Sequence, residues 1–179
     1  LIRSRKFFSL FDKVKRYLKG RPQTALQNPD DLASLFEQRE GENLSLILDH
    51  DLGGGANHYR DRLVDSIIRE GRSAIILTYH VTTLSYMVIV RNKRLNIRFS
   101  IPDTTFLLEA LKQLSVDDII YNTAVSFVKP DEIPQFLIKL KALTSARLVI
   151  LAHDFYLVCP SHFLLDHEGK YCRIPDMQV

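Results

Sequence analysis

A short apolar strand near the start of the chain runs into an acidic pair and then into three consecutive glycines. The segment from Leu44 to Ala56 reads L-S-L-I-L-D-H-D-L-G-G-G-A, and residues 57–69 carry apolar side chains at helical spacing. Glycine is entropically costly and adds no packing, so Gly53, Gly54 and Gly55 indicate a backbone that needs positive φ or close approach by another molecule. A strand, a glycine turn and a helix N-terminus together favour a bound anion, typically a phosphate.

The same glycines also fit a tight turn that only leads the strand into its helix. Their spacing differs from the G-x-G-x-x-G dinucleotide fingerprint, and the next strand ends in Thr78-Tyr79-His80 without an acidic residue. The lysine and hydroxyl pair of a P-loop is also missing. A phosphate site and a purely structural turn both remain open at this point.

Polar side chains follow each strand that we predict to be parallel. Because the carboxyl ends of parallel strands meet at one edge of a sheet, we expect these side chains to share one crevice with the glycine turn. They are Asp49, His50 and Asp51, then Asn122 and Thr123, and finally His153 and Asp154. Of these, Asp51, Asn122 and Thr123 are predicted to line the crevice itself. An imidazole and carboxylates beside a phosphate suit group transfer from a phosphate-bearing donor.

Several of these residues also have a plain structural interpretation. Asp49 and Asp51 fit capping or turn formation, which aspartate performs in any loop. His50 and His80 fit a hydrogen bond to a neighbouring backbone group, as histidines at strand ends often make.

The pattern of apolar residues predicts a Rossmann-like α/β fold, doubly wound around a mostly parallel sheet with an embedded β-hairpin. The hairpin turns at Asn92-Lys93. The predicted strands are 44–48, 73–78, 85–91, 95–100, 118–121 and 146–151, and the predicted helices are 57–70, 102–114 and 130–143. A length of 179 residues with 46% hydrophobic content is typical of a single domain, which we place at 43–179.

The first 42 residues are predicted to form a basic amphipathic helix and a linker, with a short helix near 32–38. The helix would cover about residues 1–20, and the polar stretch 21–31 reads as the linker. The helix either lies on an anionic membrane face or packs on the domain with its basic face in water. Nucleic acid is not expected as a partner, because the basic cluster is confined to one terminus.

No membrane span can be recognised, since the apolar runs fall short of ~18 residues. No signal peptide can be recognised either, because the basic N-terminus lacks an apolar core and a cleavage site. The chain has two cysteines, Cys159 and Cys172, and this count together with the missing export signal predicts a cytoplasmic setting. If the basic helix meets a membrane, the protein would sit at its inner face. The set Cys159, His162, His167 and Cys172 has the ligand types of a zinc site, but it also fits a disulfide or two structural thiols.

The glycine-turn segment combines with two later segments, H-D-F-Y-L-V-C-P from His153 and L-L-D-H-E-G-K-Y-C from Leu164. Together they resemble the N-terminal domain of retaining GT-B glycosyltransferases of bacterial polysaccharide and O-antigen assembly. The resemblance covers residues 44–176. It implies that the chain is the acceptor-side half of such an enzyme, that the donor domain lies outside the chain, and that this half is inactive alone.

The resemblance also implies roles for individual residues. Gly53, Gly54 and Gly55 would approach the diphosphate of a nucleotide-sugar, which is the co-substrate. His153 would contact the transferred sugar, while Asp154 would orient the imidazole or meet the acceptor, a glycan or lipid-linked molecule. Asp51, Asn122 and Thr123 would line the acceptor or sugar cleft. No metal or other cofactor would be needed for transfer.

Two other functions are weighed against this one. A non-catalytic α/β module that binds a phosphate or nucleotide at the glycine turn would explain the same motif. A hydrolase using His153 and Asp154 is disfavoured, because the G-x-S-x-G nucleophile elbow is absent.

Overall fold

In a computed structural model of the protein, the described residues are 27–39, 41–129, 132–157, 159 and 164–173. The elements are α2 (Pro29–Glu37), β1 (Leu44–Leu48), α3 (Gly55–Arg69), β2 (Ser73–His80), β3 (Ser85–Arg91), β4 (Asn96–Ile101), α4 (Thr104–Leu111), β5 (Val116–Tyr121), α5 (Glu132–Leu143) and β6 (Arg147–Ile150). Every strand and helix predicted between residues 32 and 151 is present, with ends that differ from the prediction by at most three residues.

The strands form a six-stranded mixed sheet in the order β4-β3-β2-β1-β5-β6. Strand β1 pairs in parallel with both β2 and β5, and β5 pairs in parallel with β6. The predicted hairpin is confirmed, since β3 pairs antiparallel with β4. Strand β3 also pairs antiparallel with β2, which was not predicted. The chain leaves β1 toward β2 on one side and returns to β5 on the other, so the sheet has its topological switch point between β1 and β5.

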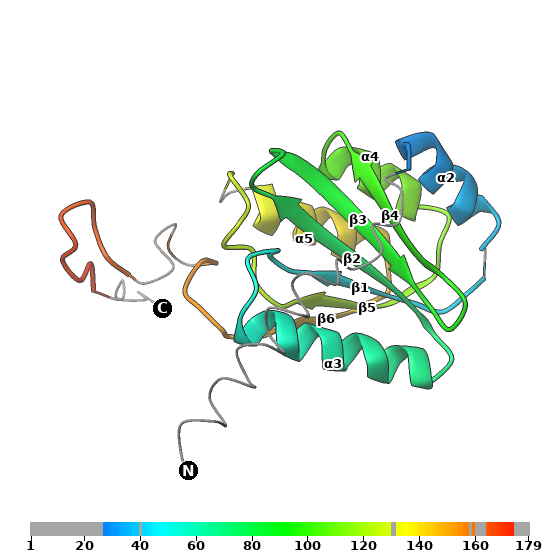
Figure 1. The fold of residues 1–179 in the computed structure, drawn as a ribbon, viewed down its shortest axis with the longest axis horizontal. Helices are drawn as coiled ribbons and strands as arrows, with labels where there is room; N and C mark the ends of the chain where they lie inside the picture. The colour runs from blue at the N-terminus through cyan, green and yellow to red at the C-terminus, as the bar shows by residue number, and fades with distance from the viewer. Residues whose placement is uncertain (1–26, 40, 130–131, 158, 160–163, 174–179) are drawn as a thin grey trace, which may run out of the picture.

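Helices cover both faces of the sheet, which confirms the predicted α/β class. Among the helices that the structure describes, α3 lies on one face, and α2, α4 and α5 lie on the other (Figure 1). The α3 side holds a small apolar cluster of Ile47, Val64, Ile67, Ala74, Ile76 and Ile120. The opposite side holds the larger core, and all five residues of β1 are buried between the two layers. Such burial is the usual state of a central parallel strand.

The predicted linker at 21–31 is wrong over its last residues. Helix α2 already begins at Pro29, and its Leu32 and Phe36 are buried in the larger core. Gln27 also pairs with β4, because its amide donates to the carbonyl of Arg98 at 3.1 Å. Proline at the first helical position explains the earlier start, since it needs no amide partner there. Residues 27–37 are therefore part of the domain.

The predicted basic helix at 1–20 lies outside the described residues, so its contact with a membrane stays a prediction. Among the helices that the structure does describe, none is long and apolar enough to cross a membrane.

Candidate functional site

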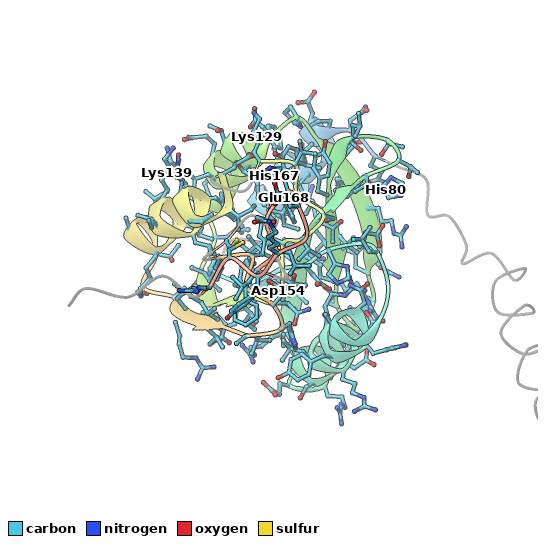
Figure 2. All side chains as sticks on the ribbon, turned by 90° about the vertical axis from the view of Figure 1, so that its left-hand side faces the viewer. His80, Lys129, Lys139, Asp154, His167 and Glu168 are labelled. Carbon is cyan, nitrogen blue, oxygen red and sulfur yellow. The ribbon has the colours of Figure 1, made fainter. Side chains whose placement is uncertain are left out.

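The polar residues that follow β1, β5 and β6 lie at one edge of the sheet, where the parallel strands end. Figure 2 views the molecule from this side, with Asp154 near the middle and His80, the last residue of β2, toward the right. The first turn of α3 lies at the same edge, because the chain passes directly from β1 through the glycine turn into that helix. This edge is the switch point at which ligands bind in open α/β sheets.

Asp49 is the centre of a buried polar network below this edge. Its carboxylate is fully buried and accepts hydrogen bonds from Asn57 Nδ2 at 2.7 Å and from Asn122 Nδ2 at 2.9 Å. Arg60 places NH1 at 3.0 Å from the same carboxylate, and its side chain is 8% exposed. A buried carboxylate needs such an opposite charge and such donors. Asp49 therefore ties β1, α3 and β5 together rather than facing a ligand.

His153 is exposed at the edge and is held from one side by Asn122. Its Nε2 lies 2.9 Å from Asn122 Oδ1, while Asn122 Nδ2 also donates to the carbonyl of Ala56 at 3.1 Å. The Tyr59 ring of α3 meets the imidazole edge-on, with ring centroids 5.6 Å apart. A single amide side chain thus separates the imidazole from the first turn of α3. The glycine turn and His153 belong to one rim.

Asp154 does not orient the imidazole, contrary to the sequence-based expectation. Its Oδ2 accepts a hydrogen bond from the Thr123 hydroxyl, and its Oδ1 accepts one from the Tyr156 amide at 2.8 Å. The two neighbouring side chains diverge, His153 toward Asn122 and Asp154 toward Thr123. Asp154 is half-buried and holds the turn after β6 in place.

Asn122 and Thr123 were expected to line a cleft, but they are 0% and 1% exposed. Their side chains are engaged with His153 and Asp154 respectively. Buried and fully engaged side chains do not contact a ligand directly. Asn122 and Thr123 instead support His153 and Asp154 from beneath.

The glycine turn is open on its outer side. Gly53 has φ +84° and Gly54 has φ +94°, which L side chains rarely adopt, whereas Gly55 has no positive φ. A Cβ placed on any of the three would meet no atom within 4 Å. Backbone conformation therefore explains the first two glycines, but neither conformation nor packing explains Gly55.

The amides at the start of α3 follow directly on this turn. Gly55, Ala56 and Asn57 make no amide hydrogen bond to any residue that the structure describes. The first turn of a helix has no internal acceptor for such amides. The nearby carboxylate of Asp49 does not fill this role, because it accepts its hydrogen bond from the side chain of Asn57 rather than from the backbone amide. The turn can therefore accept an anion from outside.

The glycine turn provides a matched pair of stability tests. Gly54→Ala should lower the free energy of unfolding by about 1–3 kcal/mol, because alanine is strained at this backbone conformation. Gly55→Ala should leave stability unchanged or raise it by about 0.4–1 kcal/mol, because helical φ suits alanine and nothing crowds its Cβ. Urea unfolding of both variants measures the difference. Equal losses in the two would contradict the described geometry.

His50 lies beneath the turn, and its ring accepts a hydrogen bond from the Leu52 amide through Nδ1 at 3.0 Å. This bond matches the plain interpretation of a histidine that bonds a neighbouring backbone group. Burial lowers the pKa of His50 below its ordinary 6.5, and the charge of Arg60 adds to this. The carboxylates of Asp49, Asp154 and Asp51 oppose the shift without cancelling it. The folded protein therefore favours the neutral ring.

A pH dependence of stability follows from His50. Because its pKa is lower in the folded state than in the unfolded chain, the unfolded chain binds the proton first. This contribution to stability is fully present above pH 6.5 and is lost as the pH falls through the folded pKa. His50→Asn, which keeps an acceptor for the Leu52 amide, should flatten the slope of unfolding free energy below pH 6.5. An identical slope in both proteins would exclude His50 as its source.

Asp51 lies away from His153, in a separate hollow on the β2–β3–β4 side. The hollow has a volume of about 370 Å³, and Asp51 shares its wall with His80, Ser85 and Arg98. Asp51 Oδ2 lies 3.8 Å from His80 Nε2. A larger hollow of about 520 Å³ lies at the opposite edge of the sheet, beside Arg72 and Arg94.

The cysteine set gives no metal centre within the described part of the chain. Cys159 and Cys172 are free thiols, the His167 side chain is 91% exposed, and His162 lies outside the described residues. No group of three or more His, Cys, Asp or Glu side chains suited to a metal ion occurs among the residues described.

Sequence reasoning missed Asn57, Tyr59 and Arg60, all in the first turns of α3. Asn57 and Arg60 are 8% and 7% exposed and continue the buried stripe of Val64 and Ile67 toward the helix start. Extending the apolar spacing of that helix backward by three and four residues would have found them. Polar residues on a buried stripe, beside an acidic strand end, indicate a buried ion pair.

Comparisons of the chain with protein-family models, with curated proteins and with solved structures gave no match. Any function assigned to this edge therefore rests on its geometry, its chemistry and the sequence motifs already described.

Proposed function

We propose that this chain is the acceptor-side domain of a retaining GT-B glycosyltransferase. It would act in transfer of a sugar from a nucleotide-sugar to a polysaccharide, a lipid-linked molecule or another cell-envelope acceptor. One observation carries the proposal: an exposed imidazole and an open glycine turn share the switch-point edge of an α/β sheet, joined through Asn122. A nucleotide-sugar needs both, an anion site for its diphosphate and a polar group for its sugar.

The glycine turn would receive the diphosphate. The free amides of Gly55 to Asn57 and the positive end of the α3 dipole favour negative charge. Gly55, which the fold alone does not require, would allow the phosphate oxygens to approach the backbone closely. Charge that develops on the leaving diphosphate is stabilised most by donors fixed before the reaction.

His153 would hold the transferred sugar. Its ring is exposed, yet Asn122 and Tyr59 fix its direction, so it presents a polar atom with little freedom to lose on binding. The resemblance to GT-B enzymes supplies the rest: front-face attack by the acceptor, and a second domain whose cations neutralise the diphosphate without a metal. In the same proposal, residues 1–20 would contact the inner face of a membrane.

The test is donor turnover by the protein that the complete reading frame encodes. The purified protein is incubated with a panel of nucleoside diphosphate sugars, with and without a membrane-extracted acceptor, and released nucleoside diphosphate is measured. Release from one donor, enhanced by acceptor, supports the proposal. Tight nucleotide binding without any release would instead support the non-catalytic module. A folded protein that neither binds nor turns over any donor would exclude both.

A further inference from the structure

Asn122 joins the buried network to the exposed imidazole, and its hydrogen bonds determine which way its amide points. Asn122 Nδ2 lies 2.9 Å from Asp49 Oδ1 and 3.1 Å from the carbonyl of Ala56. A carbonyl only accepts, and the Asp49 carboxylate, paired with Arg60 at 3.0 Å, also accepts. Both amide protons of Asn122 are therefore used, and its oxygen must face His153.

The direction of the amide in turn determines the protonation of the ring. Asn122 Oδ1 is an acceptor without a proton to offer, and it lies 2.9 Å from His153 Nε2. A hydrogen bond between them requires the proton on Nε2. In the neutral imidazole the other nitrogen, Nδ1, then carries a lone pair.

We propose that Asn122 is a positioning residue that holds His153 in the Nε2–H tautomer, so that Nδ1 is the atom presented to a ligand as an acceptor. The Asp49 carboxylate acts one step further back, because it fixes the Asn122 amide that fixes the ring. Tyr59 restricts the ring plane from the α3 side. Nδ1 has no hydrogen-bond partner among the residues that the structure describes, and the ring is exposed.

A ligand would therefore meet His153 with a hydrogen-bond donor. The tautomer follows from the contacts of Asn122 and does not depend on any activity. Naming that donor as a hydroxyl of the sugar rests on the proposed function. The two statements can thus fail separately.

The experiment is NMR spectroscopy of the full chain labelled with ¹⁵N and ¹³C, recorded at about pH 8, which is above the reference pKa of free imidazole side chains. The expected spectrum has His153 Nδ1 in the unprotonated range, Nε2 in the protonated range, and a visible Hε2 proton. A coupling across the hydrogen bond from His153 Nε2 to Asn122 Cγ should also be measurable. A proton on Nδ1, averaging of the two nitrogens, or absence of that coupling would overturn the proposal.

Two variants separate positioning from general structural support. Asn122→Leu, similar in volume but without an acceptor, should lose the Hε2 signal. Thr123→Val, the matched control at the next position, breaks the bond to Asp154 and should keep the signal. A persistent Hε2 signal in Asn122→Leu would overturn the proposal. If Asn122→Leu does not fold, the coupling from His153 Nε2 to Asn122 Cγ in the wild-type protein decides the proposal by itself. A wild-type protein that shows this coupling but turns over no donor would count only against the proposed function.

Discussion

His153→Ala should lower kcat/KM for sugar transfer by about 10²–10³-fold in the protein encoded by the complete reading frame, a loss typical of removing one fixed polar group at a reacting centre. The fold should be unaffected, because the ring is exposed and its supporting partner Asn122 keeps its bonds to Asp49 and Ala56. Initial rates of nucleoside diphosphate release measure kcat/KM, and urea unfolding measures the stability of the fold.

His167→Ala is the control for this variant, since its side chain is 91% exposed and lies on the loop after residue 164. It should turn over donor at the wild-type rate. Equal rates for wild type and His153→Ala would remove His153 from the site. A loss of turnover that accompanies unfolding of His153→Ala would mean that the ring supports the fold.

Asp49→Asn should lower the free energy of unfolding by about 3–5 kcal/mol, the usual cost of removing one partner of a buried charge pair, because Arg60 is then left with the half-exposed Asp61 as a carboxylate partner. The change removes the negative charge opposite Arg60. It also replaces one carboxylate oxygen by an NH2 group, which would point at the N–H donors of the neighbouring side chains. Asn57 Nδ2 and Asn122 Nδ2 both point at this carboxylate, at 2.7 and 2.9 Å. Urea unfolding followed by circular dichroism gives the value.

Asp61→Asn is the matched control, because Asp61 also pairs with Arg60, at 2.9 Å, but its side chain is 40% exposed. Its loss should cost about 1 kcal/mol or less, as for most exposed ion pairs. Adding Arg60→Met to Asp49→Asn should recover part of the loss, since the buried guanidinium that lost its buried partner is then removed as well. If Asp49→Asn costs no more than Asp61→Asn, the described network does not stabilise the protein.

The fold could be predicted from sequence because its elements follow local patterns. The β1 strand has five apolar or small residues before an acidic stop, and the β3–β4 hairpin has a polar connection that starts at Asn92 between two alternating strands. Such patterns can be recognised in sequence because apolar residues recur at a characteristic spacing in each helix and strand. The start of α2 was missed, because its Pro29 reads as a linker residue in sequence although it suits the first turn of a helix.

The edge that carries the site could also be predicted, since parallel strands end on one side. The roles within it could not. Asn122 and His153 are 31 positions apart, and only their hydrogen bond shows that Asn122, rather than the adjacent Asp154, holds the imidazole. Arg60 was overlooked because a charged residue in a helix usually faces water, and its pairing with Asp49 depends on how α3 packs against β1.

The most direct test of a shared ligand site at the glycine turn and His153 is an NMR titration of the ¹⁵N-labelled chain with nucleoside diphosphate sugars. The matching nucleoside is the control. We expect the largest shifts on the amides of Gly53 to Asn57 and on the His153 ring, and no change in these signals with the nucleoside alone. Largest shifts at the opposite edge, around Arg72 and Arg94, or no shift at millimolar concentrations, would contradict this expectation.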